Sequence, residues 1–256
     1  MLDLSSQSLA QNLVNNKPVK NPRQLIRLAA NNRVLFGYSL KHTELNKIKV
    51  KGKEWRKKLN ATLVFLNKTL TANFLVIRTY KYIPYVTFDV DVFVSSEDYD
   101  STISILRAAG CRIGSHDNSL GGRYKDMQKN AFKDELLTID LHRDFTWQKR
   151  RFLDVSQMFK KTRRKKIENI VVAIPSPEME FLLCMADIGH ERFNITLLDI
   201  IWIEGLSHEI TDWNLIQKQV AKHKWRRTYE SIARIINTIA MDIYGKESIP
   251  FQRVND

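Results

Sequence analysis

The feature that most constrains the fold is a short segment in which acids alternate with apolar residues, Thr87–Val94 (TFDVDVFV). Alternation with a period of two, in a run of β-branched and aromatic residues, predicts a β-strand. Because successive side chains of a strand point to opposite faces, Asp89 and Asp91 share one face and the apolar residues share the other. Two carboxylates this close repel each other and are costly to desolvate, so the segment favours a neighbouring cation.

A second strand with an acid is predicted further along the chain, at Leu136–Leu141 (LLTIDL). Here Thr138, Asp140 and His142 face one way, and the apolar residues between them face the other. If the two strands are neighbours, three carboxylates converge. Such a set suits phosphoryl transfer with two metal ions, one at the attacking oxygen and one at the triphosphate.

These acids also have a simpler interpretation, because a strand with one face in the core and one in water shows the same alternation. The later acid, the turn-rich stretch before it and the basic surroundings favour a metal site. On that interpretation Asp89, Asp91 and Asp140 bind Mg²⁺ (or Mn²⁺), which takes carboxylate and phosphate oxygens. His142 then contacts a phosphate or assists a proton transfer; the alternative is a plain polar strand residue.

The rest of the chain divides into three segments. Residues 1–70 carry apolar residues at helical spacing and predict an N-terminal helical region. Residues 71–170 predict an α/β core. Residues 171–256 predict a C-terminal helical region, whose first helix begins with Ser176 as N-cap and Pro177 in the first turn.

Within the central segment, a short β-rich run at Phe74–Ile77 precedes the first acidic strand. A helix is predicted after Ser95, and Gly110 is its expected stop. Residues 111–122 are rich in Gly, Asn and Asp and predict a turn-rich connection. The order of strand, helix, connection and strand is typical of an α/β or α+β sheet domain.

Charge points to an anionic partner. The 256 residues include 41 Lys and Arg against 28 Asp and Glu, a net charge of +13. Much of the excess lies in two segments with one acid each, Lys47–Lys58 and Lys149–Lys166. These segments are candidate contacts for RNA (tRNA) or DNA, although lysine runs are also typical of solvated helix faces and loops.

Composition excludes several classes of protein. With 43% hydrophobic and 27% charged residues, the chain is neither disordered nor collagen-like. Its two cysteines, Cys111 and Cys184, supply no zinc set and no disulfide framework, which favours a reducing cytoplasm. No signal peptide is visible at the N-terminus, and the longest apolar stretch, Leu197–Ile203, is interrupted and too short to span a bilayer.

In the pattern of its strand acids, the chain resembles the nucleotidyltransferase superfamily, which has the polymerase-beta-like fold. Asp89 and Asp91 match the paired acids of its h-D-h-D-h strand, and Asp140 matches its third acid. The segments at 139–142 (IDLH) and 174–203 look like those of small uncharacterised prokaryotic nucleotidyltransferase-like proteins. The resemblance covers roughly residues 70–205. It implies an α+β fold: a small mixed β-sheet nucleotidyltransferase core with N-terminal helices and a C-terminal helical bundle.

The resemblance also implies an activity, the metal-dependent transfer of a nucleoside monophosphate from an NTP to an unidentified acceptor hydroxyl. In that role Asp89 and Asp91 bind the metal and the triphosphate. Asp140 completes the metal site and orients or deprotonates the acceptor.

One motif of the superfamily is missing. A Gly-Ser pair, whose backbone amides hold the triphosphate, should precede Asp89 by about ten residues. The interval instead contains Arg78-Thr79-Tyr80-Lys81. We expect Thr79 to replace the serine hydroxyl, and Arg78 and Lys81 to hold phosphates by charge.

Two alternatives stay open at the level of sequence. A catalytically silent protein with the nucleotidyltransferase fold would bind nucleic acid through the basic segments, with an affinity that falls steeply as salt rises. A helical adaptor with an α/β insert would instead bind an acidic protein.

Overall fold

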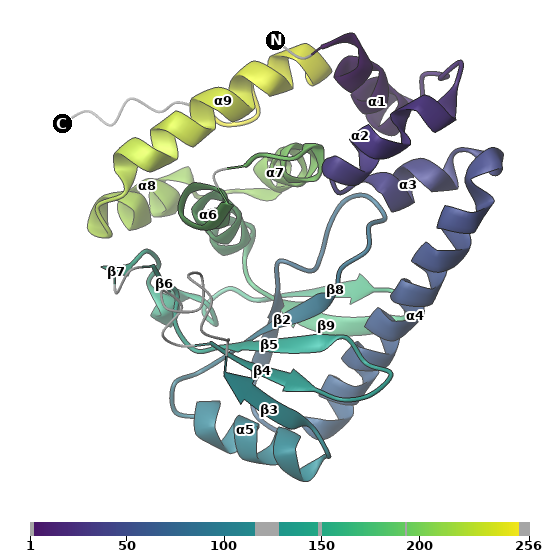
Figure 1. Cartoon of the computed structure of the whole chain (residues 1–256). Coiled ribbons are helices and arrows are strands. Elements are labelled where there is room, and N and C mark those ends of the chain that lie inside the picture. The colour runs from purple at the N-terminus through teal and green to yellow at the C-terminus, as the bar shows by residue number, and fades with distance from the viewer. Residues whose placement is uncertain (1–2, 116–127, 148–149, 193, 251–256) are drawn as a thin grey trace.

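The computed structural model describes residues 3–115, 128–147, 150–192 and 194–250. Figure 1 shows a β-sheet in the lower half of the molecule and a layer of helices above it, formed by both ends of the chain. The long helix α4 (Asn46–Thr69) runs from the helical layer down along the sheet. The fold is therefore mixed, and its sheet lies between segments of helix, as the sequence predicts.

The N-terminal segment is helical, in agreement with its apolar spacing. Asp3 begins the first helix, where its carboxylate accepts hydrogen bonds from the amides of Ser5 and Ser6. The helices before α4 are α1 (Leu4–Asn15), α2 (Ile26–Asn31) and α3 (Leu35–Leu40), with 3₁₀ turns at Pro22–Leu25 and Thr43–Leu45.

Within the described residues, the main sheet has five strands in the order β1-β2-β5-β4-β3. They are β1 (Phe74–Ile77), β2 (Asp89–Val94), β3 (Arg112–Ser115), β4 (Gln128–Phe132) and β5 (Thr138–His142). The central strands β2 and β5 run parallel, whereas the other neighbouring pairs run antiparallel. The sheet is therefore mixed, which confirms the predicted class.

The structure corrects the prediction for residues 111–122. Arg112–Ser115 is not a turn but the edge strand β3, paired antiparallel with β4. The segment contains Gly114 and has a low β-propensity of its own, so its sequence does not predict a strand. Its strand conformation is stabilised by the backbone hydrogen bonds to β4. Residues 116–122 lie outside the described part of the chain.

Smaller elements follow the sequence more closely. Helix α5 (Tyr99–Ala108) ends just before Gly110, which adopts a left-handed backbone at φ 87°. Two short antiparallel ladders lie beyond β5, and a 3₁₀ turn at Val155–Gln157 separates them. Their strands are β6 (Thr146–Trp147), β7 (Arg150–Arg151), β8 (Arg163–Ile167) and β9 (Ile170–Ile174).

The C-terminal segment returns to helix. Ser176 is the N-cap of its first helix and accepts a hydrogen bond from the Met179 amide, as predicted. The elements are α6 (Pro177–Ala186), a π-helical turn at Asp187–Arg192, α7 (Leu197–Glu209), α8 (Trp213–Lys222) and α9 (Arg226–Tyr244). In the part of the chain that the structure describes, no helix is long and apolar enough to cross a bilayer.

Buried apolar residues form two clusters, one on each side of the sheet. Val90 and Val92 pack with α4 and α5 in the cluster below the sheet. Phe93, on the other face of β2, packs with the helical layer above. Because Asp89 and Asp91 share the face of Phe93, the acidic face of the sheet is turned toward the helices.

Candidate active site

A cavity of about 700 Å³ lies between the acidic face of the sheet and the helical layer. The loop that joins β1 to β2, residues 78–88, forms one of its walls. Asp89, Asp91 and Asp140 line the cavity together with three of the predicted phosphate ligands, Arg78, Thr79 and Lys81. The fold thus brings six of the seven predicted site residues to one space.

The parallel pairing of β2 with β5 places the acids. Asp91 lies directly beside Asp140 in the register, and Asp89 lies beside Thr138. Neighbouring residues of a parallel pair point to the same face, so the three carboxylates share one side of the sheet. Asp140 is buried, whereas Asp89 and Asp91 are partly exposed to the cavity.

Asp91 is held by two basic side chains. Its Oδ1 accepts from the Arg78 guanidinium at 2.5 Å and contacts Nε2 of His142 at 2.8 Å. Burial alone would raise the pKa of Asp91, but Arg78 and His142 outweigh it and hold this pKa well below its ordinary value. The Asp91 carboxylate is therefore ionised at neutral pH.

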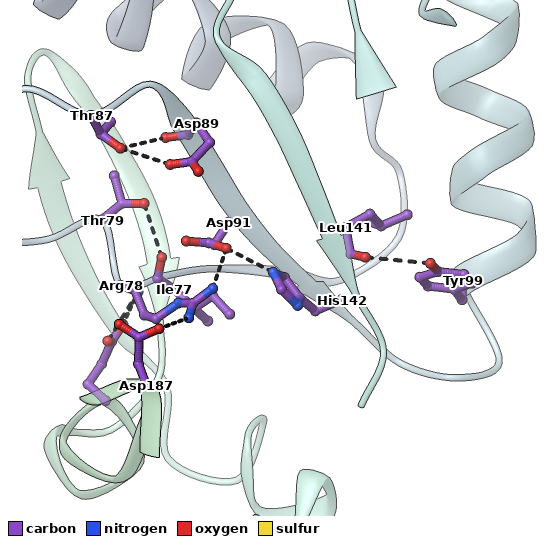
Figure 2. Close-up of polar contacts among 11 residues, drawn as sticks. Ile77, Arg78, Thr79, Thr87, Asp89, Asp91, Tyr99, Leu141, His142 and Asp187 are labelled. Atoms are coloured by element: carbon purple, nitrogen blue, oxygen red, sulfur yellow. Dashed lines mark hydrogen bonds and ion pairs between the residues drawn. The ribbon is translucent and has the colours of Figure 1, made fainter. Parts of the chain in front are cut away.

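Arg78 occupies a special position at the end of β1. Its backbone is left-handed at φ 56°, a conformation that glycine adopts most easily. Its guanidinium bridges Asp91 and Asp187, and Figure 2 shows it between these two carboxylates. Its backbone N–H donates to the carboxylate of Glu180, whose oxygens lie 3.2 and 3.1 Å away. Both the side chain and the amide of Arg78 are thus engaged by acids of the protein.

Asp89 has a different environment. Its Oδ1 accepts from the Thr87 hydroxyl at 3.0 Å, and its carboxylate turns toward Thr87 in Figure 2. Burial raises the pKa of Asp89, and the negative charge of Asp91 raises it further. Two acids on one face thus differ in proton affinity, because Arg78 and His142 are both bound to Asp91.

Thr79 and Lys81 lie in the loop wall with distinct contacts. The Thr79 hydroxyl donates to the carbonyl of Ile77 at 3.0 Å, which leaves its oxygen as an acceptor. The Lys81 ammonium lies over the ring of Trp202 in α7, 2.6 Å from the ring centroid. Loss of hydration lowers the pKa of Lys81 to about 7, against the pull of nearby carboxylates that include Glu180.

His142 is the predicted phosphate ligand that does not line the cavity. Its side chain is buried and lies behind Asp91, with the Phe145 ring stacked against it. His142 therefore holds the Asp91 carboxylate in position. In this position its side chain does not reach the cavity, where a phosphate would contact it.

Several residues of the cavity carried no signal in the sequence. Asp187 pairs with Arg78 across 109 positions, and Glu180, whose pKa burial raises to about 7, lies behind the loop. The N-terminal helices contribute Arg33 and Lys51. Asp187, Glu180 and Arg33 belong to no local pattern, whereas Lys51 lies in the basic segment Lys47–Lys58, for which the sequence predicts contact with nucleic acid rather than a place in this cavity.

Among the described residues, no group of three His, Cys, Asp or Glu side chains is close enough to hold a metal ion. The positive charge next to Asp91 is instead the guanidinium of Arg78. The predicted roles of Asp89, Asp91 and Asp140 as metal ligands therefore stay a prediction.

Comparison with known proteins decides the family. Residues 87–240, which include β2, β5 and the helices from α6 to α8, match a family described as uncharacterised nucleotidyltransferase. The chain belongs to this nucleotidyltransferase family. The match confirms the resemblance drawn from the three acids, and no curated protein matches the sequence.

The chain of this nucleotidyltransferase is also similar to two solved structures. One is the lincomycin-bound lincosamide antibiotic adenylyltransferase LnuA, at 12% identity and a TM-score of 0.38, over 60% of this chain and 97% of that one. The other is the antibiotic-resistance factor ANT(2'')-Ia in solution, at 12% identity and a TM-score of 0.39, over 70% of this chain and 95% of that one.

Proposed function

We propose that this nucleotidyltransferase is metal-dependent and transfers a nucleoside monophosphate from an NTP to an acceptor hydroxyl. The observation that carries the proposal is the register of the two central strands. It sets Asp91 beside Asp140, with Asp89 on the same face, in the wall of one cavity. A shared acidic face in a cavity large enough for a nucleotide is the arrangement that two-metal transfer requires.

The donor atoms are of the kind that the family's metal binds, although the described side chains as placed are not grouped closely enough to hold it. Carboxylate oxygens are the ligands that Mg²⁺ and Mn²⁺ take, and substrate phosphates complete their coordination. Arg78 supports this assignment, because Asp91 already binds one cation, the guanidinium. A metal bound by Asp89, Asp91 and Asp140 would neutralise the triphosphate and favour ionisation of the acceptor hydroxyl. For this, Asp91 must exchange its contact with Arg78 for the metal.

The residues of the chain then have defined tasks. Asp140 accepts the proton of the acceptor hydroxyl while the acceptor oxygen attacks the α-phosphorus, and the bond from that phosphorus to pyrophosphate breaks. Thr79 and Lys81 line the cavity in the loop wall, and His142 keeps the Asp91 carboxylate in place.

Label transfer tests the proposal directly. The full chain is incubated with Mg²⁺ and each α-labelled NTP, in the presence of tRNA, protein or small-molecule acceptors. We expect transfer with release of pyrophosphate, and a loss of at least roughly a hundredfold in Asp89→Asn and Asp140→Asn. Asp100→Asn, which changes an exposed acid on α5, is the matched control and should keep full activity. Absence of both label transfer and NTP binding would refute the proposal.

Binding to RNA or DNA through the basic segments has weaker support. In the segment Lys149–Lys166, Arg163 and Lys165 both pair with Glu209, which offsets part of its charge. Nucleic-acid binding that survives Asp89→Asn and weakens steeply with salt would favour the silent alternative over the enzyme.

A further inference from the structure

The cavity has a wall that the acids and the loop do not form. It is built by α2, α3 and α4, which all precede residues 87–240 and so lie outside the family match. The residues that this wall presents to the cavity include Arg33, Phe36, Lys51 and Trp55. The N-terminal helices therefore add groups to the site that the family-matched residues 87–240 do not supply.

In the loop of residues 78–88, the cationic side chains predicted to bind phosphates are already engaged in contacts within the protein. The Arg78 guanidinium is bound to Asp91 and Asp187, and its amide is bound to Glu180. Lys81 lies against Trp202. A triphosphate carries several negative charges and is stable in a protein site only when cations or amides face it. The charge must therefore come from another wall.

Two cations of the N-terminal wall meet this need. Among the described residues that line the cavity, Arg33 and Lys51 are cations with no ion pair to a carboxylate of the chain, whereas Arg78 is bound to two carboxylates and Lys81 lies over the ring of Trp202. Lys51 is exposed on α4, and Arg33 is exposed between α2 and α3. One turn after Lys51, Trp55 packs edge-to-face with Phe88, and both rings line the same cavity. Aromatic surface next to a cation is typical of sites for nucleotides rather than for simple anions.

We propose that Arg33 and Lys51 bind the polyphosphate of the NTP and replace the missing Gly-Ser grip. The inference rests on the proposed function and adds the residues that select an NTP. The N-terminal helices are thus part of the nucleotide site, because they supply positive charge that the loop does not, where Arg78 is bound to acids and Lys81 lies against Trp202.

Binding measurements with matched variants test the inference. Calorimetry on the full chain with Mg²⁺ compares a non-hydrolysable NTP analogue with inorganic tripolyphosphate. Lys51→Gln and Arg33→Gln should each weaken both ligands by roughly tenfold or more, since each removes a charge-assisted contact. Lys51→Arg should retain most of the affinity. The controls are Lys68→Gln on α4 and Arg27→Gln on α2, which remove the same charges at exposed positions outside the cavity.

The outcomes separate this inference from the proposed function. Equal affinities for Lys51→Gln and Lys68→Gln, with wild-type protein that binds the NTP analogue, would overturn the inference alone. Weaker binding of the NTP analogue but unchanged binding of tripolyphosphate would also overturn it, because the lost contact would then be to the nucleoside. Wild-type protein that binds neither ligand would overturn the proposed function as well.

Discussion

At the scale of single residues, Arg78 connects the two unusual features of the site. A left-handed backbone is easiest for glycine, and Arg78 lies in the interval where the resemblance to the superfamily leads one to expect a Gly-Ser pair. The side chain gained there bridges Asp91 and Asp187. Arg78 therefore places a cation in contact with a proposed metal ligand, in the interval where a phosphate-binding glycine is expected.

We predict that Arg78→Gly strengthens metal binding. Removal of the guanidinium frees Asp91, and glycine accepts the left-handed backbone, so the affinity for Mn²⁺ should rise by roughly tenfold. Electron paramagnetic resonance titration of free Mn²⁺ measures the change. Arg78→Lys, which keeps a cation near Asp91, is the control and should resemble the wild type. An affinity for Mn²⁺ that stays equal or falls in Arg78→Gly would contradict this account of Arg78.

Lys81 predicts a pH dependence of stability. Its pKa in the folded protein is lowered to about 7, below the ordinary lysine value, mainly by loss of hydration. Between pH 7 and pH 10, roughly, the unfolded chain therefore holds more protons at this residue than the folded protein does. The contribution of Lys81 to the free energy of unfolding should rise with pH across that window.

Comparison of wild-type protein with Lys81→Met isolates this contribution. The free energy of unfolding of both proteins is measured in urea at pH 7 and at pH 9.5. The value for the wild type minus the value for Lys81→Met should be larger at pH 9.5 than at pH 7. A difference that stays constant with pH would mean that Lys81 keeps an ordinary pKa.

At the scale of elements, the loop of residues 78–88 depends on helices that are remote in sequence. Tyr82 packs flat against Gly205 in α7, where a Cβ atom would lie 2.2 Å from the ring. The Tyr85 hydroxyl donates to the carbonyl of Thr79 at 2.7 Å and closes the loop on itself. Helix α7 thus positions the loop that carries the predicted phosphate ligands Arg78, Thr79 and Lys81.

Gly205→Ala should therefore destabilise the protein despite the higher helix propensity of alanine. We expect a loss of about 1–3 kcal/mol from overpacking against Tyr82, offset by up to about 1 kcal/mol of propensity. In a Tyr82→Ala background the ring is gone, and Gly205→Ala should become neutral or stabilising. A double-mutant cycle in urea measures the coupling. Additive effects of the two substitutions would show that Tyr82 and Gly205 do not depend on each other.

At the scale of the whole molecule, the cavity joins parts of the chain that are distant in sequence. Its wall combines α2–α4, the loop, the central strands and α7, and the helical layer above it contains both ends of the chain. A ligand in the cavity therefore contacts the sheet and the helical layer together. Its binding energy should stabilise both.

We predict that Mg²⁺ with an NTP analogue raises the unfolding temperature of the whole protein. At a free concentration of one hundred times Kd, the gain is about 2.7 kcal/mol, or a rise of roughly 5–10 °C. Hydrogen exchange should slow in both α4 and α7. Protection confined to the sheet would contradict a site shared by all these elements. Asp89→Asn, tested at the same ligand concentration, should lose most of the shift.

How far the sequence predicts the fold depends on how local each signal is. The strands β2 and β5 were predicted because their acids and apolar residues alternate within a few positions. The strand β4 (QKNAF), which lies between β5 and β3, lacks this alternation and depends on these two neighbours for its hydrogen bonds. The same distinction holds for the site, where a local pattern predicts the acids but Asp187 belongs to no motif. Lys51 belongs to a basic segment that predicts an anionic partner without placing it beside the acids.

The sequence by itself determined the family and the faces of the acids, because a period of two along a strand is a local property of the chain. Only the tertiary structure decided that Asp91 lies beside Asp140, since register depends on which strands become neighbours. It also decided that Arg78 is bound between Asp91 and Asp187 rather than facing a phosphate. Pairing of charges across a hundred positions depends on the packing of α6 and α7 over the sheet, which no short pattern encodes.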